Sequence, residues 1–164
     1  MSARIVEMIE AAGTAHSNST DEASLVRKAF AADELSKGKI YKFFGAFRAT
    51  ATNSTDTLTP RIRFGASGTV TSNTEIGVGS AVDVANDDTF IVDGYLHVQS
   101  ATRAVFHGSL SDCDADGSKL LNSFYQVFTI AAGTAYNLDI TADWSVANAG
   151  NSVQAEAFGV VEMF

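Results

Sequence analysis

The chain has 164 residues, of which 46% are hydrophobic and 18% are charged, and its formal net charge is −8. This composition is too apolar for a disordered chain, and a single cysteine cannot form an internal disulfide. The acidic balance argues against nucleic acid as the main partner, because phosphate binding depends on clustered Lys and Arg. The charged fraction is below the ~25% usual for a soluble domain, which favours a protein that buries part of its surface against neighbours.

Targeting signals are not expected. No apolar run approaches the ~18 residues that a membrane span needs, so a membrane partner is not predicted. Arg4, Glu7 and Glu10 interrupt the apolar stretch at the N-terminus, and a signal peptide needs an unbroken one. We therefore expect synthesis in a cytoplasm, where Cys113 stays a thiol.

Hydrophobic residues recur with a period of two along most of the chain, which is typical of strands with one buried face. Clusters of Gly, Asn, Asp and Ser separate these segments and predict turns. An all-β sandwich or barrel follows from this pattern. The expected strands cover residues 4–10, 24–31, 39–51, 57–65, 69–76, 88–99, 102–110, 119–130, 136–144 and 152–163.

Two segments need comment. Residues 19–39 are compatible with a helix capped by Ser19 or Thr20, but alternation over 24–31 and the β-rich remainder favour a strand. Pro60 falls inside the expected strand 57–65, and proline cannot donate to a ladder. That strand is therefore predicted to be an edge strand or to be bulged at Pro60.

The expected strand over 40–48 is apolar on both faces. Ile40, Phe44 and Ala46 share one face, and Tyr41, Phe43 and Phe47 share the other. Such a strand is covered by another layer or lies in a subunit interface. Basic residues are interleaved with these side chains, and on an acidic protein they favour docking to an acidic protein neighbour: Lys37, Lys39, Lys42 and Arg48.

The sequence also offers candidates for metal binding. Asp112, Asp114 and Asp116 precede Gly117 with the spacing that starts a calcium loop, but Ser123 stands where the loop needs a bidentate Glu. A solvated acidic turn is the simpler interpretation, with a weak cation site as the alternative.

His97 and His107 lie on adjacent expected strands, but a zinc site needs further ligands and no Cys or His cluster supplies them. We expect partly exposed histidines there. The acidic surroundings of Cys113 make it a poor nucleophile. The sequence contains no nucleotide-binding or hydrolase motif, so a non-enzymatic protein without cofactors is predicted.

Three segments carry a resemblance to a known family: ATNSTDTLTPRIRFG, DTFIVDGYLHVQS and LDITADWSVANAGNSVQAEAFGVVEM. They resemble jelly-roll-like virion structural proteins of tailed bacteriophages, of the capsid cement (decoration) type. The resemblance implies an all-β, antiparallel, jelly-roll-like β-sandwich as a single domain over residues 21–164. Residues 1–20 lie outside it and are expected to form an N-terminal arm or strand.

The resemblance also implies a function. We expect a homo-oligomer, a trimer, that is made in the host bacterial cytoplasm, binds the major capsid protein on the outer capsid surface and stabilises the head. The expected interface residues are Ile5, Met8, Lys39, Tyr41, Phe43, Phe47, Met163 and Phe164.

Two other functions remain open. A head-fibre or tail accessory protein would bind a receptor or glycan, with Tyr95, Tyr125 and Trp144 as candidates for stacking on sugars, although burial in the core is the favoured expectation for Trp144. A glycan-active enzyme on the same scaffold would need two carboxylates that face one cleft.

Overall fold

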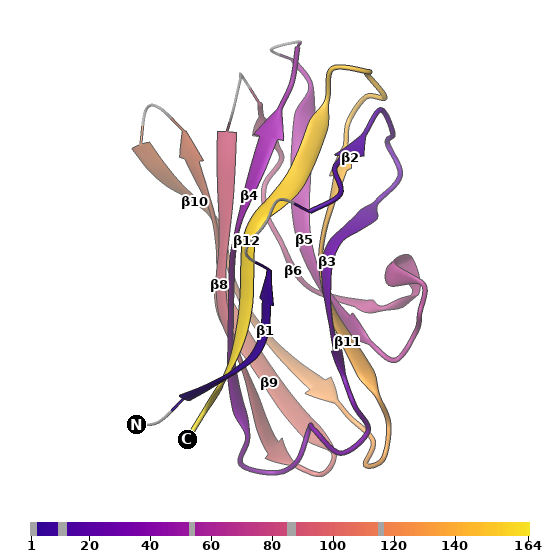
Figure 1. Cartoon of the computed structure of the whole chain (residues 1–164), viewed down its shortest axis with the longest axis vertical. Helices are drawn as coiled ribbons and strands as arrows, with labels where there is room; N and C mark the ends of the chain where they lie inside the picture. Colours follow the sequence, from indigo (N-terminus) through magenta and orange to yellow (C-terminus); the bar gives the residue numbers. More distant parts are fainter. Residues whose placement is uncertain (1–2, 10–12, 53–54, 85–87, 115–116) are drawn as a thin grey trace.

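A computed structural model of the chain describes residues 3–9, 13–52, 55–84, 88–114 and 117–164. Two antiparallel β-sheets pack face to face as a sandwich (Figure 1). A 3₁₀ turn, η1 (Val70–Ser72), lies between two strands of the smaller sheet. Within the described part of the chain, no helix has the length and apolar character to span a membrane.

The larger sheet is built from the two ends and the middle of the chain. Its strands follow the order β1 (Ala3–Ile9), β12 (Ser152–Met163), β4 (Ile40–Thr50), β8 (Asp88–Ser100), β9 (Arg103–Asp114) and β10 (Gly117–Thr129), and β2 (His16–Ser17) also pairs with β12. The smaller sheet follows the order β3 (Ala23–Phe30), β11 (Tyr136–Trp144), β5 (Thr57–Gly65) and β6 (Thr74–Val78), and β7 (Val82–Asp83) also pairs with β5.

Several consecutive strands lie in different sheets. The chain crosses the sandwich from β3 to β4, from β4 to β5 and from β11 to β12. Crossings between two antiparallel sheets are typical of jelly-roll architectures. The prediction of an all-β antiparallel sandwich is confirmed.

Aromatic side chains from both sheets fill the space between them. Phe47 and Phe90 stack with ring centroids 4.8 Å apart, and Phe64 stacks on Tyr136 at 5.1 Å. Trp144 is 1% exposed and belongs to this core, as favoured over a role in sugar stacking. Each buried aromatic side chain of this kind contributes several kcal/mol to folding, on the order of the 3–5 kcal/mol lost when one is cut to Ala.

The β8–β9 pair approaches closely at two glycines. A Cβ on Gly108 would lie 2.6 Å from the Cα of Gly94 and 2.8 Å from the ring of Phe124. Glycine is therefore required there, because it leaves room for the Phe124 ring to lie over both strands.

The ambiguous segment after residue 19 forms the strand β3, as the alternation predicted, and not a helix. The expected strand over 69–76 is wrong in its first half, where η1 precedes β6. The side chain of Asn73 explains the turn, because its Oδ1 accepts the backbone N–H of Ser67 at 2.9 Å and closes the loop.

The prediction of an edge strand at Pro60 is wrong. β5 lies between β11 and β6, and the irregularity in its pairing with β6 falls at Ile62 and Arg63. Pro60 stands opposite the gap between β6 and β7, since Leu58 pairs with Val82 and Arg61 pairs with Val78. The missing N–H is tolerated at that gap, where the Pro60 carbonyl accepts the N–H of Gly79 at 2.9 Å.

A β-bulge shifts the faces of β10. Strict alternation over 120–130 predicts Leu120 on the buried face with Phe124, but the register with β9 shifts between Leu120 and Asn122. Leu121 is buried instead, and Leu120 is 59% exposed. An extra residue in a strand moves the side chains that precede it to the opposite face of the sheet. Hydrophobic alternation alone does not reveal such a bulge.

The N-terminal segment folds back on its own chain. β1 pairs antiparallel with β12, with Ala3 opposite Met163. The strand expected over 4–10 is therefore present as β1, an edge strand of the larger sheet.

Candidate functional site

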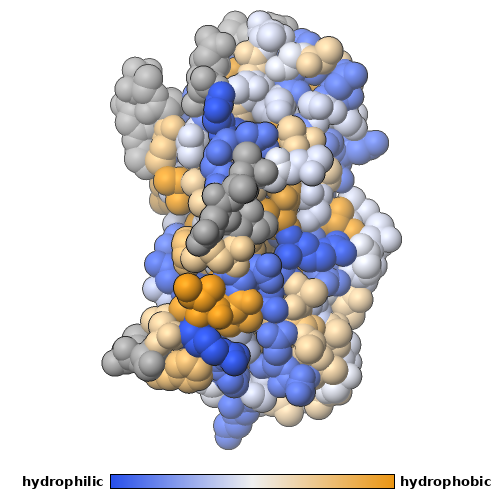
Figure 2. All heavy atoms as spheres, in the orientation of Figure 1, coloured by the Kyte–Doolittle hydropathy of each residue, from blue (hydrophilic) through white to orange (hydrophobic). Residues whose placement is uncertain are grey.

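The outward face of the larger sheet is the surface that points away from the core, formed by alternate residues of β1, β12, β4, β8, β9 and β10. Most of the exposed large hydrophobic side chains of the described residues lie on it: Ile5, Met8, Ile91, Leu120, Tyr125 and Val127. Phe164 directly follows β12, and Val146, in the loop after β11, is the exception. Figure 2 shows a hydrophobic patch over the region where β1 and β12 lie in Figure 1.

Most of the predicted interface residues lie either on the outward face or in the core. Ile5, Met8 and Phe164 are 64%, 39% and 60% exposed, and Met163 is half-buried beside them on the outward face. Lys39 is held in an ion pair with the buried carboxylate of Glu162.

Tyr41, Phe43 and Phe47 need correction. Their side chains are at most 1% exposed and belong to the core of the chain itself, so they are not available to another subunit. The strand β4 is apolar on both faces, as the sequence indicated. The smaller sheet covers the face that carries Tyr41, Phe43 and Phe47. The face left open carries Ile40, Phe44 and Ala46.

Phe44, Ile91, Tyr125 and Val127 extend the outward face beyond the predicted interface residues. Part of the signal is present in the sequence, since Tyr95 and His97 share one face of the 88–99 strand with Ile91. A single strand does not show which neighbouring strands extend an apolar surface, so this signal alone does not predict an interface.

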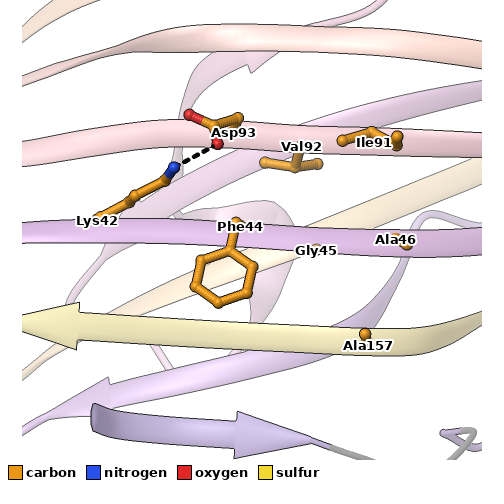
Figure 3. A pocket seen from close by; sticks show the side chains of 8 residues that line it. All are labelled: Lys42, Phe44, Gly45, Ala46, Ile91, Val92, Asp93 and Ala157. Carbon is orange, nitrogen blue, oxygen red and sulfur yellow. Dashed lines mark ion pairs between the residues drawn. The ribbon is translucent and has the colours of Figure 1, made fainter.

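A shallow hollow lies in the middle of the outward face, across β12, β4 and β8. Figure 3 shows Phe44, Ala46, Ile91 and Ala157 around it, with Lys42 and Asp93 at one side. Its volume is about 390 Å³. The Phe44 ring lies over Gly159, where a Cβ would be only 2.6 Å from the ring, so glycine is needed for this packing. A hollow of this size, floored by small residues, fits one or two apolar side chains of a partner.

The charges beside the hollow neutralise each other. Lys42 Nζ lies 2.9 Å from the Asp93 carboxylate and 5.7 Å from the centroid of the Tyr95 ring. The hydrogen bond to Asp93 outweighs the effect of burial and raises the pKa of Lys42 above its usual value. The pair therefore leaves no net charge at the centre of this face, so a partner that covers it would not bury an unpaired charge.

His97 and His107 meet on the same face, which the sequence anticipated as an approach between adjacent strands. Their Nε2 atoms are 3.0 Å apart, and Tyr95 stacks on His107 with ring centroids 5.2 Å apart. Burial, together with repulsion from His107, lowers the pKa of His97.

The outward face of the smaller sheet is different in kind. Arg63 forms two hydrogen bonds with the Glu22 carboxylate, at 2.5 and 2.6 Å, and Arg61 pairs with Glu75 and Asp143. Arg27 binds the buried carboxylate of Asp139 at 2.7 Å. This network satisfies its charges within the chain and offers no large exposed apolar group in strands β3, β11, β5 and β6.

The acidic candidates do not form a metal centre within the described residues. Asp112 is buried on the inner side of β9 and Asp114 ends that strand, while Asp116 lies outside the described residues. Among the residues that the structure describes, no group of three or more His, Cys, Asp or Glu side chains is placed to hold a metal ion.

Comparisons with known proteins give similarity to solved structures but no matching sequence family. No protein-family model and no curated protein matches the chain. A chain in the structure of infectious bursal disease virus Gx strain is similar, with a TM-score of 0.39 and 11% sequence identity. That similarity covers all of this chain and 42% of the viral chain, so this chain spans less than half the length of that protein. The function therefore has to be argued from the chain's own residues.

Proposed function

We propose that the protein is a non-enzymatic virion structural protein of the capsid cement type, which associates with copies of itself and binds the outer surface of a viral capsid. The observation that carries the proposal is the outward face of the larger sheet, where Ile5, Ile91 and Tyr125 are exposed and Ile91 lines an apolar hollow. A soluble monomer rarely exposes large connected apolar patches unless they serve binding. The resemblance to phage jelly-roll-like virion proteins supports the same function.

The distribution of charge supports docking through this face. The chain carries a net charge of −8, which opposes approach between copies wherever the charges are exposed. Beside the hollow, Lys42 and Asp93 neutralise each other. Copies can therefore meet there without repulsion from an uncompensated charge, and closed symmetry lets each copy cover the apolar face of the next.

A face of this kind can stabilise a capsid shell through many modest contacts. Each contact buries a modest apolar area, worth about 25 cal/mol per Å² before the entropy of association is subtracted. Repetition over many equivalent positions multiplies these contacts and resists expansion of the shell.

Electron microscopy of the particle that contains this protein tests the proposal. We expect trimeric density on the outer head surface, with the larger sheet of each copy against a neighbour. Density on the tail, or a particle without the protein, would contradict it.

A receptor- or glycan-binding role is the second candidate, and it rests on one observation. Tyr125 is 68% exposed, opposite His107 in the β9–β10 pair, and exposed aromatic rings can stack on sugars. Glycan-array binding that Tyr125→Ser abolishes would favour this function over cementing.

A further inference from the structure

The imidazoles of His97 and His107 project from neighbouring strands onto the outward face of the larger sheet. Their Nε2 atoms are 3.0 Å apart, which also suits a hydrogen bond from the N–H of one ring to the lone pair of the other. The two strands are paired along their whole length, so the spacing is set by the sheet and not by a flexible loop.

That spacing also matches two ligands on one metal ion. Zinc–imidazole bonds are about 2.05 Å long, which puts two ligating nitrogens roughly 2.9 Å apart at a right angle and roughly 3.3 Å apart at the tetrahedral angle. The observed separation lies between these values. Imidazole is a preferred ligand of Zn²⁺, Ni²⁺ and Cu²⁺, whereas Mg²⁺ and Ca²⁺ prefer oxygen.

The surroundings of the pair hold the rings and leave room for an ion. Tyr95 stacks on His107 with an interplanar angle of 18°, which fixes the orientation of that ring. A hollow of about 330 Å³ opens beside the two imidazoles, lined also by Ile40, Tyr95 and Met163. Water molecules in this hollow would complete the coordination shell.

We propose that His97 and His107 form a binding site for a divalent transition-metal ion of the zinc, nickel and copper group, with both Nε2 atoms as ligands. In the hydrogen-bonded pair, one neutral ring carries its proton on Nε2. When the ion binds, that ring loses the proton from Nε2 and gains one on Nδ1, so both Nε2 lone pairs face the ion and no net proton is released. Two protein ligands make an open site of modest affinity. The sequence suggested ordinary strand histidines because it could show adjacency but not the distance between the nitrogens.

Titration calorimetry of the full chain with zinc chloride tests the site. We expect one Zn²⁺ per chain, no binding of Mg²⁺, and a Kd at least tenfold weaker in His97→Gln and in His107→Gln. His16→Gln is the matched control, because His16 lies on β2, away from the pair, and its substitution should leave the Kd unchanged. Absence of saturable zinc binding, or an equal loss in His16→Gln, would overturn the proposal.

Imidazole nuclear magnetic resonance of the unsubstituted chain supplies a second readout that needs no variant. Zinc should shift the ring signals of His97 and His107 together and leave those of His16 in place. Shifts confined to one ring, or to His16, would overturn the two-ligand site. Both measurements use dilute isolated protein, in which neither a capsid nor another copy covers this face, so their outcome is independent of the proposed function.

Discussion

The outward faces of the two sheets belong to one small sandwich but differ in chemical character. On the smaller sheet, Arg27 and Arg63 are paired with Asp139 and Glu22, and the surface is a network of compensated charges. On the larger sheet, Ile91 and Tyr125 are exposed, and Ile91 lines an apolar hollow. We propose that the smaller sheet faces water and stabilises the chain, whereas the larger sheet carries the binding surface.

The largest effect on stability is expected from breaking the charge network of the smaller sheet. Arg27→Ala leaves the Asp139 carboxylate, which is 0% exposed, without its charged partner. We expect the free energy of unfolding to fall by about 2–3 kcal/mol, below the 3–5 kcal/mol of a fully buried pair, because the Arg27 side chain is 32% exposed. Urea unfolding measures this change.

Arg103→Ala is the control for that substitution. Arg103 is exposed at the start of β9 and bonds the side chain of Gln99, so its removal should change the free energy of unfolding by less than about 0.5 kcal/mol. Equal losses in the two variants would remove the distinction between the sheets.

The next largest effect is expected on self-association of the chain through the outward face of the larger sheet. Ile91→Asp places a charge beside the hollow, where a partner would have to bury it. We expect self-association to weaken at least tenfold, which corresponds to about 1.4 kcal/mol. Sedimentation velocity over a range of concentrations measures the change.

Val146→Asp is the matched control, because it adds the same charge at an apolar side chain that is 48% exposed but lies off the larger sheet. It should associate as the natural chain does. If both variants associate equally, or if Val146→Asp has the greater effect, the binding surface has been misplaced.

A smaller effect depends on pH and tests the network at Glu22. Burial alone would raise the pKa of Glu22, but hydrogen bonds from Arg63 and Thr141 and the charges of Arg63 and Arg61 outweigh it and lower the pKa. A carboxyl whose pKa is lower in the folded chain stabilises the fold above its unfolded pKa, near 4.3, and loses that contribution as the pH falls through the folded value.

Glu22→Gln should therefore cost about 1 kcal/mol at pH 7 and progressively less as the pH falls below about 4.3. Unfolding of both chains between pH 7 and pH 3 measures the difference. A cost that stays constant with pH would show that the carboxylate charge is not what stabilises this region.

The smallest effect is expected on the outward face of the larger sheet. Tyr125→Ser removes a ring that is 68% exposed, so the free energy of unfolding should change by less than about 0.5 kcal/mol. Chemical denaturation checks this expectation. A loss above about 1.5 kcal/mol would mean that the ring stabilises the chain itself rather than a complex.

Much of the fold followed from the sequence because alternation and turn residues are local signals. The strands at 57–65, 136–144 and 152–163 end where the pattern predicted. The bulge at Leu120 and the position of Pro60 depend on the neighbouring strand, which no single segment encodes. The binding face was predicted only in part, since β4 is apolar on both sides and only the packing shows that Tyr41 is inside and Phe44 outside.

The most direct test of the account is hydroxyl-radical footprinting of the protein in dilute and concentrated solution, read out by mass spectrometry. Met8 and Tyr125, on the outward face of the larger sheet, should be modified several-fold more slowly in the concentrated sample, while Val146 keeps its rate. Equal rates at both concentrations, or protection of Val146 with Met8 and Tyr125 unchanged, would contradict the assignment of this face as the binding surface.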